Sequence, residues 1–249
     1  MTKRMPLHPS DSEARPPADF ARLLATEVPV LLVGGQAVNL WALYYKDRTA
    51  DLAPFVSRDA DVLGDRETLK ELGRLAGTKP QFFPMKPPSN EVGVVIAGDA
   101  GGGAMLIEVL RHVRGPTNAQ LQDPVYTMIL GETPVRVPGP IALLQAKLAN
   151  LAEINQSGRQ DGRHVVILCR LMPAYLEDLR AAAAAGRLEE RKLIGFLERL
   201  LTVVSSKAAG RMWGVLKIDP LGMFGELSSG KLPKLAAFLR ERLARSMKG

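Results

Sequence analysis

Strand-like and helix-like patterns of apolar residues alternate up to about residue 138, and only the helical pattern continues beyond it. Before it, short apolar runs bounded by glycine, proline or acidic residues are typical of strands. These runs predict strands at residues 28–33, 59–63, 92–97, 104–110, 127–130 and 133–137. Helical spacing predicts helices at residues 17–28, 36–45 and 65–76, the last with Asp65 as its N-cap. Residues 49–57 are predicted as a loop and residues 98–103 as a hairpin loop.

After residue 138 the strand pattern stops and helical periodicity continues to the end of the chain. It predicts helices at residues 140–155, 161–184, 188–205 and 231–246. The fold class is therefore α/β (α+β), a mixed sheet with flanking helices followed by an all-helical C-terminal domain. We expect a flexible N-terminal arm at 1–17, the sheet-based core at 18–140 and the helical domain at 141–249.

The composition excludes several classes of protein. Of the 249 residues, 46% are hydrophobic and 24% charged, which is ordinary for a globular protein and unlike a disordered or fibrous chain. No apolar stretch is long enough to span a membrane, and residues 1–17 lack the apolar core of a secretory signal. The single cysteine, Cys169, excludes an internal disulfide framework. These features together predict a cytoplasmic protein.

Charge is distributed unevenly between the two halves. Residues 1–150 carry 16 basic and 16 acidic residues, whereas residues 151–249 carry 17 and 10, so the whole net charge of +7 lies in the second half. An excess of this kind suits a polyanionic partner, and it equally suits a solvated basic surface.

Several common catalytic motifs are absent from the sequence. No glycine-rich turn is closed by Gly-Lys-Ser/Thr, and there is neither an H-E-x-x-H nor a G-x-S-x-G motif. The glycines within residues 98–103 join two predicted strands and open no helix, which argues against a dinucleotide fingerprint.

Three remaining features fit one kind of chemistry. Gly34-Gly35 stands at a strand-to-helix turn, where the backbone can approach an anion, although such a pair also suits a simple turn. Asp59 and Asp61 point to one face of a strand, a pattern that suits a divalent metal and also a solvent-facing edge. Glu108 interrupts an apolar strand, either as a third ligand or as an edge charge. A phosphate turn with three carboxylates predicts two-metal phosphoryl transfer.

These motifs resemble the DNA polymerase β-like nucleotidyltransferase superfamily, and within it the AbiEii-like (toxin-type) nucleotidyltransferases. The resemblance covers residues 25–170 and rests on GGQAVNLW at 34–41, SRDADV at 57–62, IEVL at 107–110 and KLANL at 147–151. It implies transfer of a nucleoside monophosphate from an NTP, such as ATP, to a hydroxyl, with two Mg²⁺ ions. It also implies a toxin–antitoxin system and a cognate antitoxin partner.

The resemblance further implies roles for individual residues. Asp59, Asp61 and Glu108 would be the catalytic metal ligands, and Gly34-Gly35 would hold the nucleotide phosphates. Lys147 would contact the triphosphate, although its position in the sequence also suits an exposed helix cation. Asp161 matches a further acidic position of the family.

Two other residues are candidates for nucleotide binding. Gln36 replaces the serine or threonine that many members carry after Gly-Gly, and its amide offers a different donor geometry. Arg58 is interpreted either as a phosphate ligand or as a local counter-charge. Twenty-three residues separate Gly35 from Asp59, so the intervening loop is expected to fold away from the site.

The basic C-terminal segment suggests an acceptor. Residues 231–249 hold six cations and one anion, and helical spacing places Lys234, Arg242 and Arg245 near one face. These three are predicted to bind RNA, with a tRNA 3′ end as the acceptor hydroxyl. Two alternatives stay open: a small-molecule, antibiotic-type acceptor, and a non-catalytic nucleic-acid- or partner-binding protein with a decayed site.

Overall fold

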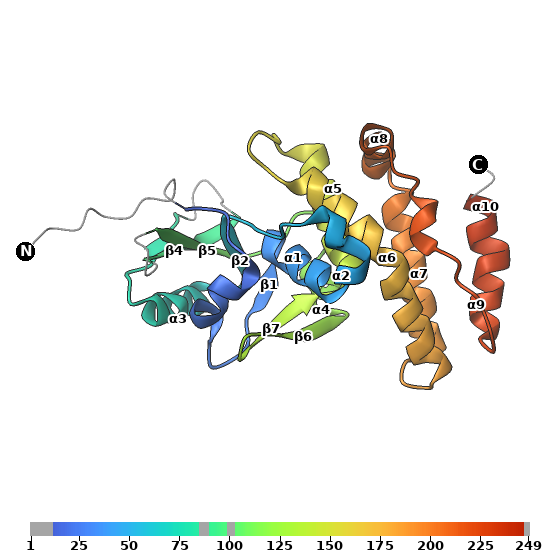
Figure 1. Ribbon diagram of the computed structural model, residues 1–249, viewed down its shortest axis with the longest axis horizontal. Coiled ribbons are helices and arrows are strands. Elements are labelled where there is room, and N and C mark those ends of the chain that lie inside the picture. Colours follow the sequence, from blue (N-terminus) through green and yellow to red (C-terminus); the bar gives the residue numbers. More distant parts are fainter. Residues whose placement is uncertain (1–11, 85–89, 99–102, 247–249) are drawn as a thin grey trace, which may run out of the picture.

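Seven strands form one mixed sheet in the order β3-β4-β5-β2-β1-β7-β6. The computed structural model describes residues 12–84, 90–98 and 103–246 (Figure 1). The strands are β1 (Leu31–Val33), β2 (Asp59–Leu63), β3 (Gln81–Phe82), β4 (Glu91–Gly98), β5 (Ala104–Leu110), β6 (Val125–Leu130) and β7 (Thr133–Pro138). All the predicted strands are present, and the short β3 is an addition because two residues are too few to show a period.

The centre of the sheet combines parallel and antiparallel pairs. β2 pairs antiparallel with β1 and parallel with β5, while β1 pairs parallel with β7. Because side chains alternate along a strand, each strand presents one set to each face of the sheet. On one face, Ala60, Val62 and Ile107 are fully buried. The carboxylates Asp59, Asp61 and Glu108 alternate with these residues and therefore face the other side.

Helices cover the two faces differently. η2 (Pro17–Leu24), α1 (Gly34–Tyr44) and α3 (Arg66–Ala76) belong to the layer that packs on the apolar face. On the opposite face, Leu121 of α4 (Asn118–Gln122) and Ala142 of α5 (Pro140–Glu153) pack against β1. This second layer leaves the β2–β5 part of the face open to the loop between α5 and α6 (Asp161–Ala184).

Two predictions at the start of the chain are wrong in detail. Residues 17–28 were expected to form a helix, yet the helix is of the 3₁₀ type and ends at Leu24. Its apolar residues Phe20, Leu23 and Leu24 are fully buried, whereas Val28 is 73% exposed. Val28 therefore belongs to neither the helix nor the strand, and β1 begins only at Leu31.

The connection from α1 to β2 is not a simple loop. It contains a short α2 (Lys46–Thr49) and a 3₁₀ turn, η3 (Ala50–Leu52). Thr49 Oγ1 donates to the carbonyl of Ala42 at 2.7 Å, and Arg163 of α6 donates to the carbonyl of Leu52 at 2.6 Å. The first bond ties the connection to α1 and the second ties it to α6. The part of the connection before Ser57 lies away from the carboxylates of β2, as expected, whereas Ser57 itself donates to Asp59 Oδ1 at 3.0 Å.

Predicted caps and turns agree with the structure. Asp65 accepts from the backbone N–H groups of Glu67 and Thr68 and forms a capping box with Thr68. β4 and β5 form the expected antiparallel hairpin, and the tip of its loop at 99–102 lies outside the described residues. Most of the predicted N-terminal arm, 1–11, also lies outside them, while Ser12 pairs with Ala104 and Arg15 with Ser57.

The second part of the chain is helical, and it extends from the sheet toward the C-terminus (Figure 1). The prediction of a mixed sheet with flanking helices and a helical C-terminal region is confirmed. After α5 and α6 come α7 (Glu190–Val204), α8 (Lys207–Leu216), η4 (Leu221–Phe224), α9 (Pro233–Ala237), η5 (Phe238–Leu243) and α10 (Ala244–Ser246).

Two features of this part differ from the prediction. α8 was missed, and the last predicted helix begins at Pro233 rather than at residue 231. Its middle turn, η5, is a π-helix, which changes the angular spacing of its side chains. Among the described residues, no helix combines the length and apolarity needed to cross a lipid bilayer.

Candidate active site

Three carboxylates from neighbouring strands meet on the open face of the sheet. Asp59 and Asp61 lie two residues apart on β2, and the parallel register pairs Asp61 with Glu108 on β5. One carboxylate oxygen from each lies within 4.8 Å of the other two. The structure thus brings together the three residues that the sequence predicted as metal ligands.

The carboxylates repel one another strongly in this arrangement. Burial, followed by the charges of Asp59 and Glu108, raises the pKa of Asp61 well above its ordinary value. Burial and the nearby Asp59 raise the pKa of Glu108 to about 7. A set of oxygen ligands that is costly to ionise without a cation suits a hard divalent ion such as Mg²⁺.

The Gly34-Gly35 turn packs directly against this cluster. Gly34 has a φ of +64°, and an ideal Cβ built on it would lie 1.8 Å from Asp61 Oδ2. A Cβ on Gly35 would lie 2.8 Å from Ser57 Oγ. Both positions therefore need glycine, Gly34 because of its φ and because Asp61 fills the space beside it, and Gly35 because of close packing.

Gln36 has a different environment from the other predicted nucleotide ligands. It is buried, and its Nε2 donates to the carbonyls of Arg15 at 3.0 Å and Ser57 at 3.2 Å. Its Oε1 accepts from Asn39 at 3.2 Å. The amide thus ties the N-terminal segment to the start of β2, and its contact with a nucleotide stays a prediction.

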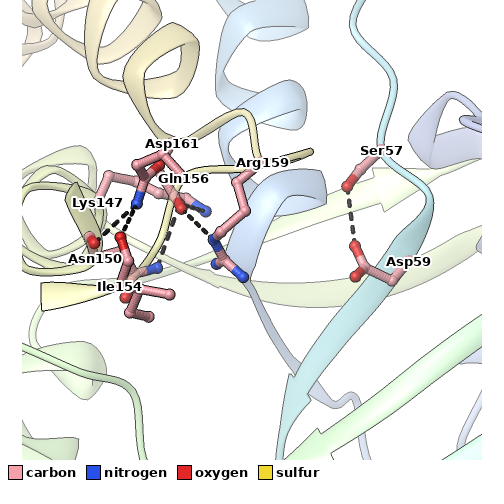
Figure 2. Close-up of polar contacts among 8 residues, drawn as sticks. All are labelled: Ser57, Asp59, Lys147, Asn150, Ile154, Gln156, Arg159 and Asp161. Atoms are coloured by element: carbon pink, nitrogen blue, oxygen red, sulfur yellow. Dashed lines mark hydrogen bonds and ion pairs between the residues drawn. The ribbon is translucent and has the colours of Figure 1, made fainter.

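A buried ion-pair cluster lies across from the carboxylates. Lys147 Nζ of α5 lies 2.9 Å from Asp161 Oδ1, and Arg159 Nε lies 2.7 Å from Asp161 Oδ2 (Figure 2). The side chains of Lys147 and Asp161 are only 8% and 1% exposed. Lys147 is thus not a surface cation of the helix. Burial opposes ionisation of Asp161, but Lys147 and Arg159 lower its pKa to about 2.

Arg159 lies between the carboxylate cluster on the sheet and the Lys147–Asp161 ion pair. Its guanidinium lies between Asp161 and Asp59 in Figure 2. Asp161, Asp61 and Asp59 all raise the pKa of Arg159 against the effect of burial. The site therefore has an acidic side on the sheet and a basic side formed by Lys147 of α5 and Arg159 of the loop that follows it.

One cavity of about 470 Å³ contains both sides. Its lining includes eight of the residues that the sequence predicted for the site: Gly34, Gly35, Arg58, Asp59, Asp61, Glu108, Lys147 and Asp161. Gln36 does not line this cavity, and Arg58 is exposed at its edge.

The C-terminal cations lie elsewhere, on the last helical segment. Lys234, Arg242 and Arg245 are exposed, and Arg242 Nε and Nη2 each donate to a Glu198 carboxylate oxygen of α7 at 3.0 Å. One of the three predicted RNA-binding charges is thus already paired. RNA binding by this segment stays a prediction.

Among the cavity-lining residues that sequence reasoning missed, Ser57, Arg159 and His164 lie beside the predicted ones. Ser57 donates to Asp59 Oδ1 at 3.0 Å and so orients that carboxylate. Arg159 and His164 flank Asp161 in the sequence and share its cavity. The available sequence signal was their spacing from Asp161: Arg159 lies just before α6, and His164 lies about one helical turn into it.

Comparisons with known proteins add little beyond this geometry. No family model matches the chain, and no curated protein matches it either. One solved structure, described as an antigenic nucleotidyltransferase-like protein from Paracoccidioides brasiliensis, is similar at 14% sequence identity and a TM-score of 0.41. The match covers 86% of this chain and 95% of that one. At this TM-score the neighbour does not locate a ligand or a substrate in this chain.

Proposed function

We propose that this protein is a Mg²⁺-dependent nucleotidyltransferase that moves a nucleoside monophosphate from an NTP to a hydroxyl and releases pyrophosphate. The observation that carries the proposal is the cavity itself. Three carboxylate oxygens within 4.8 Å of one another face a buried Lys147 and the partly buried Arg159 across it. Acidic metal ligands opposite fixed cations suit a metal-bound polyphosphate.

Asp59, Asp61 and Glu108 are the residues that would hold magnesium, as two ions. When bound, the ions would lower the pKa of the acceptor hydroxyl and neutralise charge on the departing pyrophosphate. The donor set fits because burial, followed by the neighbouring carboxylates, raises the pKa values of Asp61 and Glu108, and a divalent cation would offset both effects. Ser57 fixes the orientation of Asp59 through its hydroxyl.

The basic side of the cavity would bind the triphosphate. Asp161 holds the Lys147 ammonium and the Arg159 guanidinium in place, so little side-chain entropy is lost when phosphate binds. A charge that is already oriented stabilises developing negative charge without reorganisation. In this scheme Asp161 positions the cations, and Arg58 adds a cation at the cavity edge.

The motifs favour an AbiEii-like, toxin-type enzyme with an antitoxin partner, acting in the cytoplasm. An RNA, such as a tRNA 3′ end, is the acceptor class that the uneven charge favours. The +7 of the whole chain comes from residues 151–249, beyond the neutral sheet-based part. A small-molecule hydroxyl is the alternative acceptor.

The test is a transfer assay on the full chain. Purified protein is incubated with Mg²⁺ and each α-labelled NTP, in the presence of total RNA, tRNA alone or a small-molecule extract. We expect label on RNA with one preferred base. Label on the small-molecule fraction would identify a small molecule, and not RNA, as the acceptor. The absence of transfer from every NTP would contradict the enzymatic proposal.

Matched variants connect the assay to the site. Asp59→Asn and Asp61→Asn are expected to abolish transfer while the unfolding free energy stays level or rises, because each removes one repelling charge. Asp65→Asn is the control, since it changes an exposed carboxylate of the next element and asparagine still caps the helix. Near-native turnover in either site variant would refute the metal assignment.

A further inference from the structure

One exposed side of α8 carries positive charge that no acidic residue neutralises. Lys207 lies in the first turn of the helix, Arg211 one turn later and Lys217 at the C-cap, and all three are exposed. Within the part of the chain that the structure describes, none of the three forms an ion pair or a side-chain hydrogen bond. Residues 199–218 include no acidic residue. Because like charges one turn apart destabilise a helix slightly, this arrangement suits an anionic partner.

The apolar side of α8 faces the protein interior. Ala209 is fully buried and Trp213 is 7% exposed, and Val215 is the one large apolar residue of the helix that is exposed. A helix that binds a lipid surface needs an apolar side that is free to enter the bilayer, which α8 lacks. Its exposed side instead combines the cations with Gly210 and Gly214, where an added Cβ would meet no heavy atom within 4 Å. Such a face lets a polyanion approach the helix backbone closely.

The backbone conformation of Lys217 supports a role for its side chain. Its φ is +55°, and in the described ranges it is the one residue other than glycine with a positive φ. Glycine is usual at a left-handed C-cap, because a Cβ is strained there. A cation elsewhere in the last turn would satisfy the helix dipole without strain. The dipole alone therefore does not require a lysine at this position.

The C-terminal end of α8 adjoins the basic side of the candidate active-site cavity. α8 packs against α5, the helix that carries Lys147. A Cβ built on Gly162 would lie 3.8 Å from Leu216 Cδ2 and 3.9 Å from Leu151 Cδ2. Gly162 directly follows Asp161, which lines the cavity, so the basic face of α8 begins next to the cavity rim.

The last helical segment is less well placed. α9 packs against α7, and Arg242 is paired there with Glu198. In Figure 1, α9 and α10 lie beyond α7, at the end of the molecule remote from the sheet. A polyanion bound along α8 therefore reaches the cavity more directly than one bound at residues 233–246.

We propose that the exposed face of α8 binds the phosphate backbone of the RNA acceptor and leads its 3′-hydroxyl to the cavity. A rise of about 1.5 Å per residue makes the helix about 15 Å long, which is enough to contact several phosphates of one strand. The inference rests on the proposed function for the reaction and for the acceptor class, but RNA binding at α8 is testable without transfer.

The experiment is a fluorescence-anisotropy titration of the full chain with labelled tRNA, in EDTA and without NTP, at several salt concentrations. The test variant combines Lys207→Glu and Arg211→Glu. The control combines Arg74→Glu and Lys79→Glu, two exposed cations of the neutral half, so both variants change the net charge equally. We expect the α8 variant to raise the Kd for tRNA by about 10-fold or more and to reduce the salt dependence of binding, while the control stays within about 3-fold of wild type.

Lys217→Gly is a second test variant, in case the first fails to fold. Glycine suits the φ of this position, so we expect the unfolding free energy to stay level or rise while the affinity for tRNA falls. Wild-type tRNA affinity in both α8 variants would overturn the proposal.

Vesicles of phosphatidylserine and phosphatidylcholine are titrated in parallel, because a lipid surface is the other large polyanion that a basic face can bind. We expect no vesicle binding that depends on α8. Vesicle binding that the α8 variant abolishes, with its tRNA affinity unchanged, would assign the face to a membrane surface and would also overturn the proposal.

The transfer assay separates this inference from the proposed function. Wild-type protein that binds tRNA through α8 but transfers nothing from any NTP would refute the enzyme and leave the RNA-binding face. Transfer to limiting tRNA at the wild-type rate by the Lys207→Glu, Arg211→Glu variant would leave the enzyme and overturn the face.

Discussion

Asp61 Oδ2 lies 1.8 Å from the point where a Cβ atom on Gly34 would be. The first residue of α1 and β2 are thus packed so closely that Asp61 leaves no room for a side chain at position 34. Because Gly34 also has a φ of +64°, an L-side chain there is strained even without a neighbour. The glycine turn therefore shapes the acidic cluster as well as the approach to the cavity.

This relationship predicts the effect of Gly34→Ala. The new methyl group must push the Asp61 carboxylate away, so we expect loss of Mg²⁺ affinity and of transfer, with a fall of about 1–3 kcal/mol in the unfolding free energy. Gly77→Ala is a matched control, because its φ is +63° and nothing lies within 4 Å of the added Cβ. Urea denaturation and Mg²⁺ titration of both variants measure the difference. Equal Mg²⁺ affinity in the two would contradict the packing argument.

Glu108 predicts a pH dependence of stability in metal-free protein. Its folded-state pKa of about 7 lies above its ordinary value of 4.5, so the folded protein binds this proton more tightly than the unfolded chain. The unfolding free energy is therefore expected to fall as pH rises from about 4.5 through about 7, by on the order of 2–3 kcal/mol. Subtracting the pH profile of Glu108→Gln from that of wild type, both in EDTA, isolates this group. The fall should shrink in Mg²⁺, and a flat difference profile would contradict the assigned environment.

Removing the charge of Lys147 is expected to lower the unfolding free energy and to weaken nucleotide binding. Lys147→Met leaves the buried Asp161 with Arg159 and the Asn150 amide, so we expect a loss of about 3 kcal/mol of stability and weaker NTP binding by the folded protein. Lys70→Met is the control, since its pair with Glu67 is exposed and costs less than about 1 kcal/mol to remove. Thermal unfolding and nucleotide titration check both effects. Unchanged nucleotide affinity would restrict Lys147 to a structural role.

The C-terminal cations predict a salt-sensitive interaction with RNA. Reversing the charge at Lys234 and Arg245 is expected to weaken RNA binding and its salt dependence while leaving NTP binding unchanged. Arg242→Gln is preferable at the third position, because a glutamate there would face Glu198. Arg74→Glu with Lys79→Glu makes the control, with two exposed cations changed in the neutral half. RNA affinity that is flat between about 50 and 200 mM salt would favour a small-molecule acceptor.

Sequence alone determined the elements whose signals are local. The short apolar run at residues 104–110 and the period of 3.6 in residues 161–184 predicted a strand and a helix that the structure contains. The N-cap at Asp65 could be predicted from the sequence, because its hydrogen bonds reach only two or three residues along the chain. The shared face of Asp59 and Asp61 likewise follows from strand geometry.

Only the tertiary structure decided what the chemistry-bearing residues contact. The register that sets Asp61 beside Glu108 joins segments 47 positions apart, and no local period encodes such a pairing. Lys147 reads as an exposed helix cation until α6 brings Asp161 to it. Gln36 turns inward to carbonyls contributed by two other segments, and His164 reaches the cavity because α6 packs across α1. These contacts depend on which distant segments pack together, and the local sequence around a single residue carries no information about that packing.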